Sequence, residues 1–465
     1  MRENDEIYDA FVDDDWYYEM CAVRAFEKYG IGLTVKQLGQ QWLDNSCGSY
    51  GSSAVALKNL RRGIQAPDCG HPRYNRVWWT IGPVFCSELY GAITPGMPNE
   101  AGRMAREYGH VNGFAESVDG AVFNAGAISL AFVERDTKLV IRRAVELLHP
   151  SSPYRQCVEM VIKLVDEGQS FETICNAIED RWHIEYPASN NAVPNGGLAA
   201  ASLWFGEGDF WKTINLASRA ADYTDTDNSA AGAIAVLAAM HGMKALPAEL
   251  VAQLNDRIVG TEMNKVVFTP AVDERISTLA NRTANIGEKI VTSQGGQVHD
   301  GMIGISTQAI EQQPAERFRL ADLMQYWNPD WTLERAGLGG DGVGAMPGIR
   351  GITYLDGETL ITYPRDEARG VVLRHTARLG ANPKLKFRVA AEPQKAWELL
   401  VYAGNQQLHK QLVVGDTETF KWHDIEIDLA KFAGQNCVLR LYQRTLMPGQ
   451  FKIPGNAYWQ AIELR

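Results

Sequence analysis

From residue 14 to about residue 330, the hydrophobic positions recur mostly with the three- and four-residue spacing of amphipathic helices. Several of these runs stop at a glycine, as at Gly30 and Gly63. We expect helices over residues 16–29, 34–43, 53–62, 77–90, 100–108, 120–133, 137–148, 154–166, 171–181, 197–205, 210–221 and 229–240. Helices joined by loops rich in proline and glycine predict a large orthogonal all-α bundle.

After residue 330 the hydrophobic positions alternate with polar ones in short runs separated by Gly, Asn, Asp and Pro. This period of two is typical of strands in an antiparallel β-sandwich. We expect strands within residues 351–362, 370–379, 385–390, 397–402, 420–429, 437–444 and 457–464. The predicted fold class is therefore multidomain: an all-α bundle over residues 1–340, followed by an antiparallel β-sandwich of the jelly-roll type over residues 341–465.

Composition narrows the classes of partner. The chain has 45 Lys and Arg residues against 56 Asp and Glu residues, and this net charge of −11 argues against nucleic acid as the main partner. No apolar run approaches the roughly 18 residues that a membrane helix needs, so we expect no membrane partner. The first residues, MRENDEIYDA, do not resemble a signal peptide, and the cysteines form no CxxC pair, so we expect a cytoplasmic protein.

Two acidic clusters stand out, and each comes directly before a predicted helix. The first is Asp13-Asp14-Asp15, and the second lies in the stretch from Asp222 to Asn228. Mg²⁺ takes oxygen ligands and prefers carboxylates, so the two clusters together predict a magnesium site if the fold joins them. The alternative is that each cluster only caps its helix, because Asp and Asn are favoured N-caps and complement the helix dipole.

Several motifs in order resemble the ADP-ribosylglycohydrolase family, over roughly residues 10–260. They are VDDDWYYE (residues 12–19), LKNLRRG (57–63), AITPGMP (92–98), AREYGHVNG (105–113), GEGDFWKT (206–213) and DTDNSAAGAI (225–234). The resemblance implies an all-α fold with two Mg²⁺ ions. It also implies hydrolysis of an N- or O-glycosidic bond in an ADP-ribosyl or other ribofuranosyl-type conjugate, by a metal-oriented water that attacks the anomeric carbon.

Carried over by position, the resemblance assigns roles to individual residues. Asp14 or Asp15 is expected to be the base that takes the proton of the water. Trp16 stands where the family usually has Thr, so we expect an altered second metal site. The metal ligands are expected to be Asp13, Asp14, Asp15, Asp225, Asp227 and Asn228, and the substrate contacts to be His110, Asn112, Gly113, Ser117 and Gly120. The alternative function is a catalytically silent family member that binds a sugar or a nucleotide.

Other positions have two interpretations each. His110 either contacts substrate or bonds a loop backbone, and Gly120 is most simply a small residue that permits close packing. Asp209 is expected to cap the helix that begins at Phe210. The segments 422–435 and 457–464 resemble galactose-binding-like jelly rolls, so a carbohydrate partner is one alternative for the sandwich. Its aromatic residues, such as Trp397, Trp422 and Trp459, serve either as core or as a sugar platform.

Overall fold

The structure, a computed structural model, describes residues 10–11, 14–183, 185–186, 188–220, 225–260, 266–300, 302–337, 353–364, 369–446 and 455–465. The chain divides into two compact units. The helical unit comprises Met1–His71 and Val77–Arg317, and the β unit comprises Pro72–Arg76 and Phe318–Arg465. The units divide between Arg317 and Phe318, earlier than the predicted boundary near residue 340, which lies outside the described residues.

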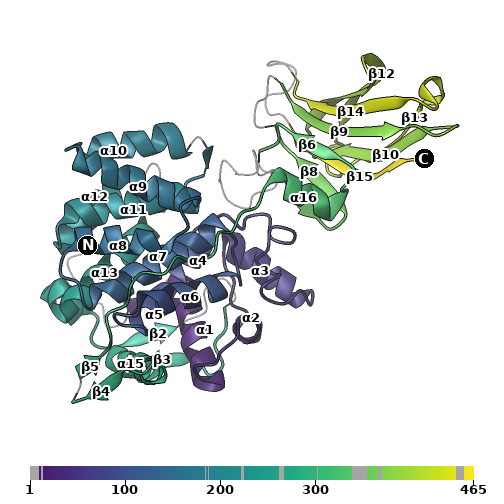
Figure 1. Cartoon of the computed structure of the whole chain (residues 1–465). Helices are drawn as coiled ribbons and strands as arrows, with labels where there is room; N and C mark the ends of the chain where they lie inside the picture. Colours follow the sequence, from purple (N-terminus) through teal and green to yellow (C-terminus); the bar gives the residue numbers. More distant parts are fainter. Residues whose placement is uncertain are drawn as a thin grey trace. The chain divides into compact units, whose positions relative to one another are not determined.

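The helical unit contains the predicted helices over most of its length (Figure 1). Their bounds are α1 Asp14–Tyr29, α2 Val35–Asp44, α3 Gly51–Arg61, α4 Gly82–Phe85, α5 Glu88–Ala92, α6 Pro98–Gly109, α7 Glu116–Ala131, α8 Thr137–Ala144, α9 Pro153–Asp166, α10 Phe171–Ile178, α11 Ala192–Gly206, α12 Phe210–Arg219, α13 Thr226–His241, α14 Ala248–Gln253 and α15 Ile276–Ser293.

Side chains at the N-termini set where several of these helices begin. Thr34 and Gln37 form a capping box at α2, in which each side chain accepts a hydrogen bond from the backbone N–H of the other residue. Asp209 accepts a hydrogen bond from the Lys212 N–H at 2.6 Å, which confirms the predicted cap of α12. Such caps satisfy backbone donors that the helix itself leaves unpaired.

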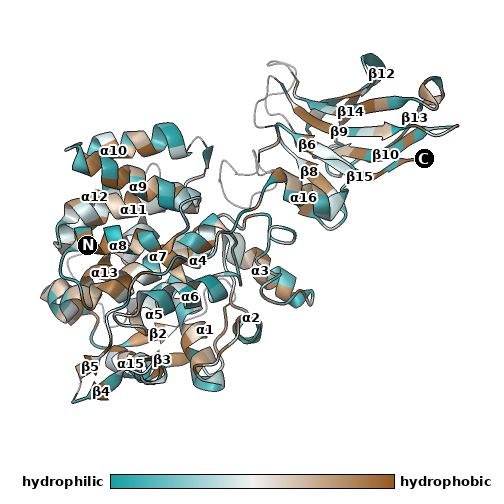
Figure 2. Cartoon of the chain, viewed as in Figure 1, coloured by the Kyte–Doolittle hydropathy of each residue, from teal (hydrophilic) through white to brown (hydrophobic). Residues whose placement is uncertain are grey.

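The centre of the helical unit is α7, in which every residue is buried. Its small residues let α5, α6 and α13 approach closely, and α11 is buried almost as completely. Figure 2 shows the hydrophobic colouring of the inner helices beside the more polar outer ones. A helix that is apolar all round must be covered on every side, so the sequence is consistent with this central position.

Two parts of the helical unit differ from the prediction. The run 77–90 is not one helix, because turns and the proline at the start of α4 break it into the short helices α4 and α5. Between residues 258 and 304 the chain also forms short strands, β2 Ile258–Gly260, β3 Val272–Glu274, β4 Gln297–His299 and β5 Met302–Gly304, with β1 Ala10–Phe11 pairing in parallel with β2. Strands of two or three residues are too short to show a period of two.

After β5 the chain continues without helix or strand to residue 317, and we call residues 305–317 the strap. Asn99 on α6 holds it at two points, donating to the Ala309 carbonyl at 2.8 Å and accepting from the Glu311 N–H at 2.9 Å. Further along, the Gln313 N–H donates to the Leu147 carbonyl at 2.7 Å. The strap therefore belongs structurally to the helical unit.

The β unit begins with α16 Leu320–Trp327 and continues as two antiparallel five-stranded sheets. One sheet has the order β13-β10-β15-β8-β7 and the other β12-β11-β14-β9-β6. The strands are β6 Thr332–Glu334, β7 Tyr354–Asp356, β8 Thr359–Thr362, β9 Val371–Arg378, β10 Lys384–Ala391, β11 Ala396–Ala403, β12 Gln406–Val414, β13 His423–Asp428, β14 Asn436–Arg444 and β15 Ala457–Leu464.

Alternation of buried and exposed residues along these strands builds one core between the two sheets, and the colouring in Figure 2 follows it. Trp397 and Trp459 are fully buried in that core, with ring centroids 5.1 Å apart, so they are core residues rather than a sugar platform. Trp422 and Tyr458 are only half-buried. The predicted fold class, an all-α domain followed by an antiparallel β-sandwich, is confirmed.

All seven cysteines are buried and free, so no disulfide crosslinks the chain. Within the described residues, none of the helices has both the length and the apolar character that crossing a membrane requires.

Candidate functional site

The two acidic clusters, which lie far apart in the sequence, line one cavity of about 290 Å³ in the helical unit. We call it the aspartate cavity. Asp14 and Asp15 come from the first turn of α1, whereas Asp225 and Asp227 come from the N-terminus of α13. The oxygen-bearing side chains that line it are Tyr50, Ser52, Ser53, Thr80, Asn190, Asn228 and these four aspartates. Asp13 and Asp222 lie outside the described residues.

One of these aspartates, Asp225, does not cap its helix. Asp225 occupies the N-cap position of α13, yet its side chain makes no capping hydrogen bond. By contrast, Asp209 and Asp136 do cap their helices with their carboxylates. The positive ends of the α1 and α13 dipoles both favour carboxylates, but a second reason is needed to gather four of them at one cavity.

One wall of the aspartate cavity carries hydroxyl groups held by a hydrogen-bond network. Thr80 Oγ1 donates to Ser52 Oγ at 2.9 Å, and both residues are buried. Asn112 Nδ2 donates to Ser53 Oγ at 3.0 Å, and Ser117 Oγ donates to the Thr80 carbonyl at 2.8 Å. The hydroxyls are therefore fixed in place by neighbours behind the wall.

The start of α13 is held by Asn195, a buried residue of α11. Its Oδ1 accepts from the Asp225 N–H at 2.9 Å and from Ser229 Oγ at 3.4 Å, while its Nδ2 donates to the carbonyls of Ser189 and Asn191. From the sequence, Asn195-Gly196-Gly197 is interpreted first as a turn before a helix and second as the lining of a pocket, and Asn195 and Gly196 do line the inner cavity described below. No local pattern reveals this role, because the residues that Asn195 joins are about thirty positions apart in the chain.

None of the five predicted substrate contacts is among the described lining residues of the aspartate cavity. Asn112 and Ser117 support the wall hydroxyls. Gly113 lies against Pro83, since a Cβ there would approach Pro83 Cγ to 2.2 Å. Gly120 packs against Tyr154 and Val84, each of which a Cβ would approach to 2.8 Å. Their role in substrate binding stays a prediction.

His110 bonds the strap. Its Nε2 lies 3.0 Å from Glu316 Oε1, its Nδ1 lies 2.6 Å from the Arg106 carbonyl, and the Ala115 N–H donates to Glu316 Oε2 at 2.7 Å. Burial alone would raise the pKa of Glu316, but these hydrogen bonds and the Arg106 charge lower it below its usual value. The arrangement makes Glu316 a charged anchor of the strap.

Trp16 does not line the aspartate cavity among the described residues. Its indole packs edge-on against Phe268, with ring centroids 5.7 Å apart, and a Cβ on Gly260 would approach it to 2.9 Å. The side chain therefore lies against the β2 region.

Asp14 and Asp15 raise the pKa of buried groups around them. Burial raises the pKa of the Cys47 and Cys86 thiols, and repulsion by these aspartates adds to the effect. Burial, together with the Asp14 charge, likewise raises the pKa of Tyr18, whose hydroxyl accepts from the Ser49 N–H at 3.0 Å. These thiols and the phenol are therefore neutral, and none is activated as a nucleophile.

The donor set of the aspartate cavity fits a hard cation in type. Carboxylate, amide and hydroxyl oxygens are the ligands that Mg²⁺ prefers. The wall residues Ser52, Ser53 and Thr80 already form hydrogen bonds within the protein. No group of three or more acidic, His or Cys side chains in the described part of the chain is close enough together to hold a metal ion. Water and substrate would have to complete the coordination, as they commonly do for Mg²⁺.

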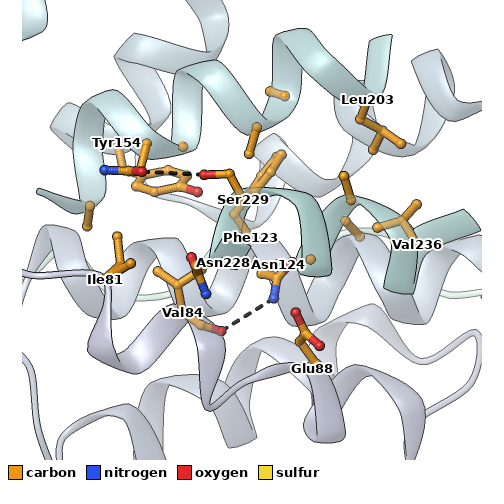
Figure 3. A pocket seen from close by; sticks show the side chains of 18 residues that line it. Ile81, Val84, Glu88, Phe123, Asn124, Tyr154, Leu203, Asn228, Ser229 and Val236 are labelled. Carbon is orange, nitrogen blue, oxygen red and sulfur yellow. Dashed lines mark hydrogen bonds between the residues drawn. The ribbon is translucent and has the colours of Figure 1, made fainter. Parts of the chain in front are cut away.

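A smaller cavity of about 40 Å³ adjoins the aspartate cavity and shares Ile81 and Asn228 with it (Figure 3). We call it the inner cavity. It is largely apolar, and Figure 3 shows Asn124 and Glu88 on one side of it. Its volume suits one or two water molecules rather than a substrate ring.

Comparison with known proteins gives one match that spans most of the helical unit. A family model described as ADP-ribosylglycohydrolase matches residues 3–287. No curated protein sequence is a significant match.

Solved structures resemble the chain only weakly. The K1 cleaved adhesin domain of Lys-gingipain from Porphyromonas gingivalis W83 is 18% identical, with a TM-score of 0.18, and the match covers 29% of this chain and 72% of that one. A family 35 carbohydrate binding module from Clostridium thermocellum is 13% identical, with a TM-score of 0.16, over 28% of this chain and 89% of that one. The family GH115 glucuronidase BtGH115A is 10% identical, with a TM-score of 0.17, over 75% of this chain and 40% of that one. Similarity this low carries no functional argument.

Proposed function

The chain belongs to the ADP-ribosylglycohydrolase family, and from this premise we propose that it is a Mg²⁺-dependent hydrolase whose active site is the aspartate cavity. The bond cleaved is the N- or O-glycosidic bond of an ADP-ribosyl or other ribofuranosyl-type conjugate. The observation that carries the proposal is the convergence of Asp14, Asp15, Asp225 and Asp227 on one cavity.

The roles of individual groups follow from their chemistry. Asp14, Asp15, Asp225, Asp227 and Asn228 would hold two Mg²⁺ ions, with Asp13 as a further ligand from outside the described residues. When bound, Mg²⁺ would withdraw electron density from the oxygens of the sugar hydroxyls or the diphosphate.

The chain's own carboxylates would move the proton. Asp14 or Asp15 would accept a proton from the water whose oxygen attacks the anomeric carbon. The carbon–nitrogen or carbon–oxygen bond to the leaving group then breaks, and the leaving group departs with its electron pair and takes up a proton. The hydroxyl wall of Ser52, Ser53 and Thr80 offers donors and acceptors for the ribose hydroxyls.

The test is hydrolysis of a substrate panel: ADP-ribosyl-arginine, nucleosides and furanosides, each with Mg²⁺ and with EDTA. At least one conjugate is expected to turn over, and EDTA is expected to abolish turnover. Asp14→Asn should lower kcat by roughly a hundredfold or more, the usual contribution of a general base or of a preorganised charge.

The matched control is Asp209→Asn, because Asp209 also stands at a helix start but caps α12 outside the aspartate cavity. It should leave turnover unchanged. Turnover that survives both EDTA and Asp14→Asn would remove the metal mechanism. Calorimetric binding of ADP-ribose with no turnover of any conjugate would instead identify a silent binding member of the family.

A further inference from the structure

A second large cavity in the helical unit contains two glutamates. It has a volume of about 410 Å³ and lies between α1, α5, α7, α13 and α15. We call it the glutamate cavity, after Glu19 on α1 and Glu88 on α5. No described residue lines both this cavity and the aspartate cavity.

Apart from the two glutamates and Thr283, the described walls of the glutamate cavity are apolar. The Trp16 indole and the Phe132 ring supply flat surfaces, and α13 supplies a wall of Ala235, Ala238 and Ala239. Small residues on α13 leave room where larger side chains would fill the space. An apolar cavity of this size suits a small organic molecule with a hydrophobic body.

The glutamates are the polar feature of this cavity. Glu19 Oε1 accepts a hydrogen bond from the Leu89 N–H at 2.7 Å. Glu88 Oε1 is closed to solvent and has no hydrogen-bond partner. Glu88 also lines the inner cavity, where Figure 3 shows its carboxyl group beside Asn124, and a Cβ on Gly232 would lie 3.4 Å from its Oε1.

No Lys, Arg or His is among the described residues that line the glutamate cavity. Burying a carboxyl group costs free energy unless donors satisfy its oxygens. Glu19 has the Leu89 N–H, whereas Glu88 Oε1 has no hydrogen-bond partner, so folding alone does not explain the pair. Burial raises the pKa of Glu19 to about 7, against a pull in the other direction from the Leu89 N–H. Burial also raises the pKa of Glu88, and the charges of Glu19 and Asp15 raise it further. A cationic ligand would neutralise the negative charge that deprotonation of this pair leaves in an apolar cavity.

We propose that the glutamate cavity binds a small organic cation, namely an ammonium group carried on an aromatic or aliphatic body. The ammonium group would donate to the carboxyl groups of Glu19 and Glu88, both of which line the cavity. The body would pack against Trp16, Phe132 and the alanine wall, where a cation over the indole gains further attraction.

Other occupants match these features less well. A neutral apolar molecule would offer no donor to either carboxyl group. A bare metal ion would need more oxygen ligands than Glu19, Glu88 and Thr283 offer. A protonated amine has three donors and an apolar end, so it satisfies both parts of the cavity.

The test measures binding to the full-length chain by isothermal titration calorimetry, with 2-phenylethylamine as the probe and 2-phenylethanol as its neutral counterpart. The amine is expected to bind, and the alcohol to bind roughly tenfold more weakly or not at all, because it cannot form a charge-assisted hydrogen bond. Glu88→Gln should weaken amine binding by a similar factor. Ala238→Leu fills the cavity without changing a carboxyl group, and it should abolish amine binding.

The control variant is Glu288→Gln, an exposed glutamate on α15 outside the cavity lining, and it should bind the amine like the wild type. Absence of amine binding to the wild type would overturn the proposal. Equal binding of the amine and the alcohol would also overturn it, and that comparison needs no variant to fold. Amine binding that persists in both Glu88→Gln and Ala238→Leu would place the ligand elsewhere. None of these readouts depends on hydrolase activity.

Discussion

At the residue scale, Asp225 separates a structural role from a functional one. It stands where a helix cap belongs but makes no capping hydrogen bond. Asp14, Asp15 and Asp227 line the same cavity, and their negative charges repel the charge of Asp225. A cation bound in the cavity would offset this repulsion.

The first prediction concerns Asp225→Asn. The variant removes one of the four carboxylates that line the aspartate cavity. With excess MgCl₂ the melting temperature of the wild type should rise, since an ion at a hundred times its Kd stabilises the native state by about 2.7 kcal/mol. The rise should be smaller in the variant, whereas Asp209→Asn should respond like the wild type. An equal response to MgCl₂ in all three proteins would exclude Asp225 as a ligand.

Trp16 shows why a single departure from a family pattern is hard to interpret from the sequence. The substitution of Trp for Thr next to three aspartates suggested an altered metal site. In the structure the indole packs against Phe268 and lines the glutamate cavity instead. A side chain one position along a helix points about 100 degrees away, so adjacency in the sequence did not place it in the site.

The second prediction concerns Glu19 and pH. Burial raises its pKa in the folded state from 4.5 to about 7. In this window the folded protein holds a proton that the unfolded chain releases, so the free energy of unfolding should fall as pH rises from about 4.5 to 7. The loss is up to roughly 3 kcal/mol, at about 1.36 kcal/mol per pKa unit.

Glu19→Gln should remove much of this dependence and should stabilise the protein at pH 8. The measurement is urea unfolding followed by circular dichroism at a series of pH values. Glu288→Gln serves as the exposed control and should keep the wild-type profile. A wild-type profile in Glu19→Gln would show that the carboxyl group is not buried in the protonated form.

At the element scale, the packing of α7 against α4 and α9 depends on glycine. A Cβ on Gly120 would lie 2.8 Å from Tyr154 Cε2 on α9 and 2.8 Å from Val84 Cγ2 on α4. Tyr154 is itself fixed on its other side, because a Cβ on Gly196 of α11 would approach its Cζ to 2.2 Å. A rigid ring held between two glycines cannot easily move.

The third prediction is that Gly120→Ala destabilises the helical unit by about 1–3 kcal/mol, the usual cost of overpacking. Helix propensity alone would make alanine favourable, so the sign of the effect separates packing from propensity. Gly32→Ala is the control, because a Cβ there would meet nothing within 4 Å. Thermal unfolding of the two variants should differ, and equal melting temperatures would mean that α9 shifts to make room.

The sequence predicted most of the helices and strands that have a clear hydrophobic periodicity of their own. The helices from α6 to α13 and the strands β9, β10, β11, β13, β14 and β15 were expected close to their observed places. It missed β12, whose burial is mostly partial or absent along its length, because an edge strand shows only a weak alternation. It could not indicate the strap, since residues 305–317 have no repeating pattern and are ordered by partners such as Asn99 and His110.

The same limit applies to the candidate site. The aspartates could be predicted because clustered carboxylates are costly and therefore conspicuous in the sequence. Thr80, Ser52 and Asn195 could not, because each is an ordinary polar residue whose role depends on neighbours brought together by the fold. His110 was expected either to contact substrate or to bond a loop backbone. In the structure its Nδ1 lies 2.6 Å from the Arg106 carbonyl, and its Nε2 lies 3.0 Å from Glu316 of the strap, far along the chain.

At the scale of the whole molecule, the two units have separate hydrophobic cores. The core of the β unit is formed by residues from Leu323 to Ile462, whereas the cores of the helical unit end at Val291. A bound ion at the aspartate cavity stabilises only the unit that contains the ligands, unless the units unfold together.

The last prediction therefore uses calorimetry on the full-length chain. Two unfolding transitions are expected, and MgCl₂ should raise only the one that belongs to the helical unit. Leu439→Ala removes a fully buried side chain from the sandwich core and should cost about 2–5 kcal/mol there, so it should lower only the other transition. Hydrolase activity at temperatures below both transitions should be the same in Leu439→Ala as in the wild type, because the aspartate cavity belongs entirely to the helical unit. A single transition that both MgCl₂ and Leu439→Ala displace would mean instead that the two cores unfold as one cooperative system.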